Sequence, residues 1–143
     1  MTEKIYEKYA WILLLIVGIV GFMVGSQEMI FGEFVDPQVA ESLTGKTWEE
    51  MASDPFIKFV TRAHGLAFLE LSVLILGIAG FGYRKGEKWA WYVSWSIPAF
   101  LLGAFSLFFT AKGSVWHVQL VLTIVALLGI LLSSRARKFF PRE

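Results

Sequence analysis

Six polar side chains lie within or beside long apolar stretches of the sequence, and these residues could carry chemistry. A carboxylate in apolar surroundings, close to an imidazole or an amide, can hold a cation or move a proton. The acids and histidines show neither H-x-x-x-H nor E-x-x-H spacing, so we expect no metal site and no cofactor. The residues leave open whether the protein is an enzyme. The candidate ligand-binding residues are Glu28, Arg62, His64, Glu70, His117 and Gln119.

The composition predicts that these side chains belong to an integral membrane protein. Hydrophobic residues make up 56% of the 143 residues, charged residues make up 17%, and the mean hydropathy is +0.61. A soluble domain of this size cannot bury so much apolar surface. The net charge of +1 favours no nucleic-acid partner. Because the chain has no cysteine, it offers no disulfide, no thiolate nucleophile and no iron–sulfur ligand.

Four apolar stretches are long enough to cross a bilayer. A hydrocarbon core of about 30 Å takes about 20 residues of helix at about 1.5 Å per residue. The stretches run roughly over residues 10–31, 57–83, 89–110 and 115–133. The last two connections are short, so consecutive helices should be antiparallel neighbours. The sequence therefore predicts an all-α fold, in which residues 1–143 form a single transmembrane domain, an up-down four-helix bundle.

The long connection between the first two stretches, residues 32–56, carries signals for short helices. Asp36 and Asp54 each stand directly before a proline, which is typical of a capped first turn. The Thr-Trp-Glu-Glu sequence at residues 47–50 fits a capping box. We expect the second spanning helix to start at Asp54. Before it we expect one or two short helices, around Pro37–Leu43 and Trp48–Ala52.

Lys and Arg are unevenly distributed about the four stretches, which predicts the orientation of the chain. Nine lie on the side of the two termini: Lys4, Lys8, Arg84, Lys85, Lys88, Arg135, Arg137, Lys138 and Arg142. Four lie on the other side: Lys46, Lys58, Arg62 and Lys112. Basic residues are retained in the cytoplasm during insertion. Both termini should therefore be cytoplasmic, with the loop of residues 32–56 outside.

On this topology, most of the candidate site residues gather in the outer half of the membrane. Glu28 lies near the outer end of the first helix, and Arg62 and His64 lie near the outer start of the second. His117 and Gln119 lie at the outer start of the fourth helix. Glu28 could pair with Arg62 or with His64 across the first two helices, which would stabilise helix packing whether or not a ligand binds.

Glu70 lies deeper, close to the expected midplane. A charged carboxylate at that depth is costly, so intramembrane acids usually face the interior of a bundle. We expect Glu70 to face inward, to be paired or protonated, and to line a cavity. Its partner should come from another helix, and the candidates are Ser106, Thr110, Gln119 and Thr123.

Small residues and one proline predict how the helices pack. Gly21 and Gly25 in the first helix have the spacing that allows a second helix to approach closely, as do Ala99 and Gly103 in the third. Pro98 should kink the third helix and free a carbonyl near Ser94.

The order of the spans, the acidic outer loop and the linker YRKGEKWAWY at residues 83–92 resemble a group of small four-helix membrane proteins. These are the DoxX-like and EXPERA proteins, the latter including emopamil-binding and sigma-2-receptor-like members. The acids Glu28 and Glu70 are similar in placement to the acid pair that lines the pocket of sigma-2-type members. The resemblance implies an internal cavity for a sterol-like or amine-bearing lipid. In isomerase members it implies proton transfer on a sterol.

Two functions of different classes follow from these residues. The first is a bundle that binds a lipophilic or amine-bearing small molecule among its polar residues. The second is a non-catalytic accessory subunit of a larger membrane complex, in which the polar groups meet a partner chain or a second copy. Membrane lipid surrounds the chain in both cases.

Overall fold

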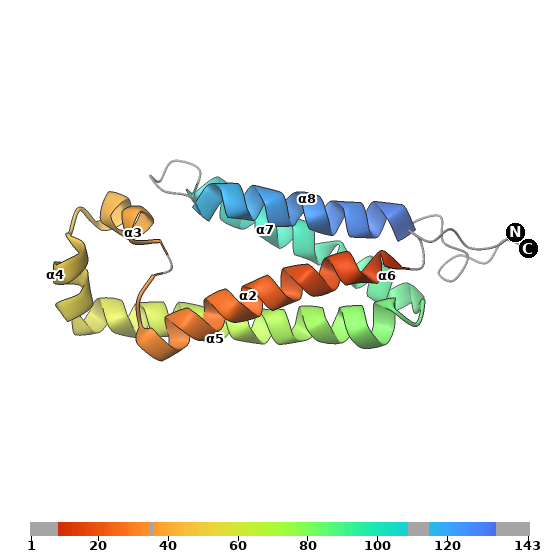
Figure 1. Cartoon of the computed structure of the whole chain (residues 1–143), viewed down its shortest axis with the longest axis horizontal. Helices are drawn as coiled ribbons and strands as arrows, with labels where there is room; N and C mark the ends of the chain where they lie inside the picture. Colours follow the sequence, from red (N-terminus) through yellow and green to blue (C-terminus); the bar gives the residue numbers. More distant parts are fainter. Residues whose placement is uncertain (1–8, 35, 109–114, 134–143) are drawn as a thin grey trace, which may run out of the picture.

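The structure is a computed structural model that describes residues 9–34, 36–108 and 115–133. The described part of the chain is all-α and contains no strand (Figure 1). Its elements are α2 (Trp11–Phe31), α3 (Pro37–Thr44), α4 (Trp48–Ser53), α5 (Pro55–Gly77), the π-helix η1 (Ile78–Tyr83), α6 (Lys88–Ser94), α7 (Ser96–Phe108) and α8 (Val115–Ser133). These bounds agree with the four predicted apolar helices and confirm both short helices of the first connection.

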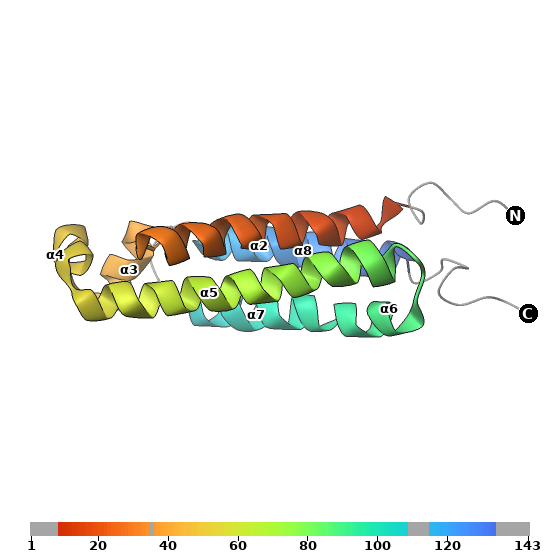
Figure 2. The same cartoon turned by 90° about the horizontal axis from the view of Figure 1, so that it is seen from below.

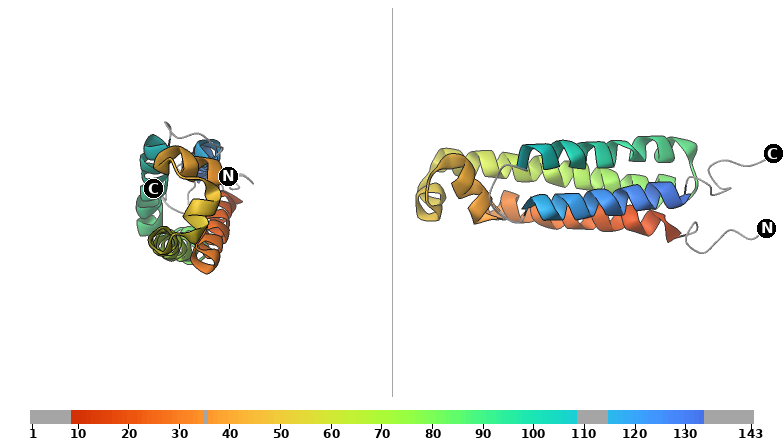
Figure 3. Two further views of the ribbon diagram at one scale, coloured as in Figure 1. Left: turned by 90° about the vertical axis from the view of Figure 1, so that its left-hand side faces the viewer. Right: turned by 90° about the horizontal axis from the view of Figure 1, so that it is seen from above.

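The long helices lie side by side in an elongated bundle, with α3 and α4 at one end (Figures 1 and 2). Seen from that end, the bundle is four-sided, and α3 and α4 lie over it (Figure 3). Helix α2 packs most extensively against α5, α7 packs against α8, and α8 packs against α2. Helices α5 and α7 make much less contact with each other. One side of the bundle is therefore more loosely packed than the other three.

Glycines bring the backbones of α2 and α5 into contact. A Cβ atom built on Gly25 would lie 2.8 Å from the carbonyl oxygen of Gly65. A Cβ atom on Gly65 would lie 2.5 Å from the backbone nitrogen of Met29. The predicted packing role of Gly21 and Gly25 is confirmed, since a Cβ atom on Gly21 would lie 2.5 Å from Ser72 Oγ. The role of Gly65 in this contact was not predicted from the sequence.

The corresponding prediction for the third helix is wrong. Ala99 and Gly103 are both exposed, and a Cβ atom on Gly103 would meet no described atom within 4 Å. The small-residue spacing therefore marks no helix contact within the described chain. Close approach needs a second helix that presents small residues at the same level, and α7 does not meet one there.

The predicted break in the third helix is confirmed. The chain leaves the helical pattern at Trp95, between α6 and α7, three residues before Pro98. Proline has no N–H to donate to the Ser94 carbonyl one turn earlier, so the regular hydrogen-bond ladder cannot continue. The Ser94 side chain points back along α6, where its hydroxyl donates to the Ala90 carbonyl at 2.6 Å.

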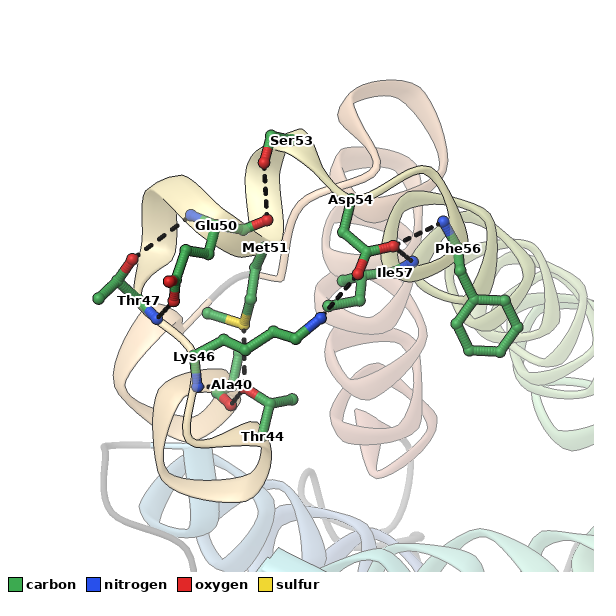
Figure 4. A network of polar contacts seen from close by, with 10 residues as sticks. All are labelled: Ala40, Thr44, Lys46, Thr47, Glu50, Met51, Ser53, Asp54, Phe56 and Ile57. Atoms are coloured by element: carbon green, nitrogen blue, oxygen red, sulfur yellow. Dashed lines mark hydrogen bonds and ion pairs between the residues drawn. The ribbon is translucent and has the colours of Figure 1, made fainter.

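Side-chain caps hold the α3–α4 end together (Figure 4). Thr47 and Glu50 form the predicted capping box, with the Glu50 carboxylate accepting from the Thr47 N–H at 2.8 Å. Asp54 caps α5 by accepting from the N–H groups of Phe56 at 2.9 Å and Ile57 at 3.3 Å. The predicted start of the second long helix at Asp54 is therefore confirmed.

The opposite end of the bundle contains a π-helix that the sequence did not predict. It carries Tyr83, which is fully buried and donates its hydroxyl to the Gly129 carbonyl at 3.1 Å. The same hydroxyl forms a hydrogen bond with Ser133. Nearby, the Arg84 guanidinium lies 5.2 Å from the ring centre of Trp11, a cation–π distance. These contacts join the end of α5 to α8 and to α2.

Two helical segments, Trp11–Phe31 and Pro55–Tyr83, are long and apolar enough to cross a membrane by length and composition. A shorter apolar helix covers His117–Ser133. The described chain is thus a helical bundle with two candidate spanning helices.

Candidate functional site

A carboxylate and an imidazole meet inside the bundle, close to its α3–α4 end. Glu28 Oε2 lies 2.6 Å from His64 Nδ1. Glu28 is only 4% exposed, whereas His64 is half-buried. Of the two partners that the sequence allowed for Glu28, the structure selects His64.

The glycine contact between α2 and α5 explains how this pair forms. A Cβ atom on Gly65 would lie 2.8 Å from Glu28 Cβ, so the base of the Glu28 side chain rests against α5. His64 is the neighbouring residue on α5, and its ring therefore reaches the carboxylate directly. The Glu28 carboxylate accepts the Nδ1–H of His64, which leaves Nε2 as the second polar atom of the ring.

Aromatic rings continue from this pair toward α7. The His64 ring lies 4.7 Å from the Phe68 ring between centroids. Phe68 in turn meets Phe100 of α7 edge to face, with 6.0 Å between centroids. The series Glu28–His64–Phe68–Phe100 therefore links α2, α5 and α7.

These residues line a cavity of about 540 Å³ that runs inside the bundle. Residues of α2, α3, α5, η1, α6, α7 and α8 contribute to its wall, and most of them are apolar. Its polar lining residues are Glu28, Asp36, His64, Ser72, Ser96 and Gln119. A mostly apolar cavity of this size with a few polar groups is typical of a small-molecule site.

Gln119 is the polar lining residue whose hydrogen bonding is incomplete. It is 7% exposed, and its Oε1 atom is buried without a hydrogen-bond partner among the described residues. By contrast, the Ser72 hydroxyl donates to the Phe68 carbonyl within α5 at 2.6 Å, and the Ser96 hydroxyl of α7 donates to the Val93 carbonyl of α6 at 2.7 Å. A buried acceptor without a donor is costly, so the Gln119 amide can gain from a donor that enters the cavity.

The cavity opens on the loosely packed side of the bundle. Seven of its lining residues are exposed, and five of these seven are Val60, Leu74, Val93, Ser96 and Phe100. These five belong to α5 and to the α6–α7 pair, the neighbours that make least contact. The other two exposed lining residues are Leu43 of α3 and Val118 of α8, so the opening is mainly lateral and mostly apolar.

Three candidate residues lie outside this cavity, namely Arg62, His117 and Glu70. Arg62 is exposed and lies against the end of α2, where a Cβ atom on Gly32 would be 3.1 Å from Arg62 Nε. His117 is exposed at the start of α8 and does not line the cavity. Of the six candidate residues, the structure brings Glu28, His64 and Gln119 to one cavity.

The expectation that Glu70 faces inward is wrong. Glu70 is exposed and lies on the outer face of α5, away from the cavity. Helical geometry gives the reason, because six residues at about 100° each place Glu70 about 120° around α5 from His64. His64 faces the cavity together with Phe68 and Leu71, so Glu70 cannot.

The partners that the sequence suggested for Glu70 are also not beside it. Ser106 is exposed on α7 and donates to the Gly103 carbonyl at 2.7 Å, while Thr110 lies outside the described residues. The Thr123 hydroxyl donates to the carbonyl of Gln119 at 2.7 Å within α8. Within the described chain, no three His, Asp or Glu residues converge as metal ligands would.

Several cavity residues were not identified from the sequence. Phe68 and Leu71 follow His64 at helical spacings of four and seven residues, so the periodicity could have indicated them. Asp36 and Phe100 come from other elements, and no local signal connects them to His64.

Comparison of the sequence with protein-family models, with curated proteins and with solved structures finds no match. The geometry of the cavity is therefore the basis on which a function can be argued.

Proposed function

We propose that this chain is a multi-pass membrane protein with four spanning helices and both termini in the cytoplasm. The apolar stretches of the two candidate spanning helices support this, because only 28% of each is buried within the chain. Core helices of a soluble protein would be mostly buried. The large apolar side chains that α2 and α5 expose, such as Met23, Phe59 and Leu74, would face lipid. The uneven distribution of Lys and Arg supports the orientation.

We further propose that the cavity binds a lipophilic molecule that carries a basic amine. The observation that carries this proposal is the buried Glu28 carboxylate, held by His64 in the wall of an otherwise apolar cavity. A carboxylate in such surroundings favours a cation, since charge-assisted hydrogen bonds are strong where water is scarce. The Gln119 Oε1 atom offers a second acceptor to the amine.

The apolar wall would hold the rest of the ligand. The cavity volume of about 540 Å³ is within the range of sites for drug-sized molecules. Its lateral opening between α5 and α6–α7 would let the ligand enter from the lipid rather than from water. The resemblance to DoxX-like and EXPERA proteins is consistent with this ligand class.

A direct test uses a fluorescent alkyl dimethylamine and the alcohol of the same chain length as probes. The purified protein in nanodiscs is titrated with each probe. The amine should bind at least about tenfold more tightly, which corresponds to about 1.4 kcal/mol. Glu28→Gln keeps the size and hydrogen-bonding capacity of the side chain but removes its charge. This variant should lose the preference for the amine.

The matched control is Glu33→Gln, which removes an exposed carboxylate five residues later along the chain. It should bind the amine as the unmodified protein does. Thermal unfolding of each variant shows whether the bundle is intact. Equal affinity for the two probes, or an amine preference that survives in folded Glu28→Gln, would refute the ligand proposal.

A second function, as a subunit of a larger membrane complex, is supported by a different observation. This observation is the exposed Glu70 carboxylate on the outer face of the bundle.

A further inference from the structure

Glu70 lies in a shallow groove on the outer surface of the α2–α5 pair, which shares only Leu74 with the lining of the cavity. Helix α2 contributes Phe22, Ser26 and Met29 to this groove, and α5 contributes Glu70 and Val73. Phe22, Met29 and Val73 are apolar and exposed. The carboxylate is thus surrounded by side chains that would themselves face lipid.

Glu70 also stands far from either end of its helix. It comes 15 residues after Pro55 and 13 residues before Tyr83 in a segment long enough to span a membrane. At about 1.5 Å per residue, the two ends lie about 22 Å and 20 Å away, too far for the side chain to reach water at the interface. The described residues provide no hydrogen bond or ion pair to this carboxylate.

A charged carboxylate on the lipid-facing surface at this depth is unfavourable unless a cation pairs with it. The described residues offer no Lys or Arg at the same level. The nearest Lys or Arg residues along α5 and its end are Arg62, about 12 Å away along the axis, and Arg84, about 21 Å away.

A second copy of the chain cannot supply the missing cation. Copies inserted into one membrane share one orientation, so a symmetric pair in contact at this groove would bring one Glu70 toward the other. Two carboxylates repel each other. The charge that would complement Glu70 must come from a different chain.

We propose that this groove is the docking surface for a transmembrane helix of a partner protein that carries an Arg or Lys near the membrane midplane. Ser26 supports the fit, because it is the small residue between Phe22 and Met29 on α2 and leaves space beside Glu70. Ion pairs between helices are favourable in lipid because neither group can otherwise be solvated. The proposal rests on the membrane placement proposed above, but not on amine binding in the cavity.

The test measures energy transfer between the whole protein and synthetic spanning peptides in lipid vesicles. Because the natural chain has no cysteine, Glu49→Cys on the exposed surface of α4 provides a single site for the donor dye. Three leucine–alanine peptides carry the acceptor dye. The first has one central Arg, the second has Leu at that position, and the third has the Arg moved eight residues toward the end.

The central-Arg peptide should reach half-maximal transfer at a mole fraction at least about tenfold lower than the other two peptides. Glu70→Gln, which removes the charge and keeps the shape, should abolish that difference. Glu87→Gln removes an exposed carboxylate at the end of the bundle and should leave the difference intact.

Three results would overturn the docking proposal. The first is equal transfer with the central-Arg and the leucine peptides, and the second is an Arg preference that persists in Glu70→Gln. The third is Glu70-dependent association of donor-labelled and acceptor-labelled copies of this chain without any peptide, because a second copy would then occupy the groove. Loss of amine binding would leave the docking proposal standing. Failure of the chain to insert into vesicles would remove both proposals.

Discussion

Helix α5 meets its two neighbours in opposite ways. Toward α2 it presents Gly65, and the two backbones touch: a Cβ atom there would lie 2.8 Å from the Gly25 carbonyl oxygen. Toward α7 it presents Phe68, whose ring reaches Phe100 at a centroid distance of 6.0 Å. One side is closed by backbone contact, whereas the other is bridged by two rings and opens into the cavity.

The difference shows how a small bundle can hold a fixed polar pair and still leave internal space. The α2–α5 contact places Glu28 Oε2 2.6 Å from His64 Nδ1. The α5–α7 side has no such backbone contact, and the cavity of about 540 Å³ inside the bundle opens mainly there. The face of α5 toward α2 thus makes close backbone contact, whereas its face toward α7 borders the opening of the cavity.

The largest effect on stability is expected when a side chain is introduced into the backbone contact between α2 and α5. Gly65→Leu should lower the free energy of unfolding by about 3 kcal/mol or more, the upper end of the usual cost of overpacking. The reason is that the atoms in the way are backbone atoms of α2, which cannot rotate aside. SDS-induced unfolding in mild detergent, followed by tryptophan fluorescence, measures the change.

Gly103→Leu is the matched control for this substitution. Gly103 is also a helical glycine, but a Cβ atom there meets no described atom within 4 Å. The unfolding free energy of the Gly103→Leu variant should stay within about 0.5 kcal/mol of that of the unmodified protein. If the two variants are equally stable, the backbone contact between α2 and α5 is not what holds the bundle together.

A smaller effect is expected on the open side. Phe100→Ala should cost about 1 kcal/mol, because the ring is partly exposed and loses mainly its edge-to-face contact with Phe68. The same change should widen the lateral opening and speed the dissociation of the alkyl amine probe. Stopped-flow fluorescence measures that rate.

Phe81→Ala provides the comparison for this rate. Phe81 is an exposed ring on η1 that does not line the cavity. Its removal should leave both stability and probe dissociation nearly unchanged. Dissociation that is as slow in Phe100→Ala as in Phe81→Ala would show that the probe does not leave between α5 and α7.

The elements of this fold could be read from the sequence because their signals are local. The predicted short helix Pro37–Leu43 ends one residue before the observed end of α3, and Asp54 caps α5 as expected. A proline with a capping acid before it determines a helix start whatever packs around it. The break near Ser94 is equally local, because it follows from Pro98 alone.

The direction in which each helix face points could not be read in this way. Helical geometry fixes the angle of about 120° between His64 and Glu70, but not which of the two faces the interior. That choice depends on Gly65 meeting Gly25, a match between helices that are distant in sequence. The level of a residue along the bundle follows from the order of the helices, so His64 and Gln119 were correctly expected at a similar level. The face on which a residue lies does not follow from that order, and Glu70 faces outward instead of inward.

The smallest effect on stability is expected from protonation of Asp54, which caps the start of α5. The hydrogen bond from Lys46, at 2.7 Å, and the N–H groups of Ile57 and Phe56 lower the pKa of Asp54 below its ordinary value of 3.8. A carboxyl whose pKa is lower in the folded protein adds stability above its unfolded pKa. That stability is lost as the pH falls through the lowered value.

Carboxyl carbon NMR should therefore show Asp54 titrating below pH 3.8, with exchange of the Phe56 and Ile57 amides accelerating as it protonates. Lys46→Met should move the midpoint upward, toward 3.8, because the largest cause of the shift is removed. Lys85→Met, near the opposite end of the bundle, should leave it unchanged. Since Asp54 is exposed to water, this titration should loosen only the first turn of α5, while the contact between Gly25 and Gly65 persists. Unfolding of the whole α2–α5 pair at the same midpoint would show that the two helices depend on this cap rather than on their glycines.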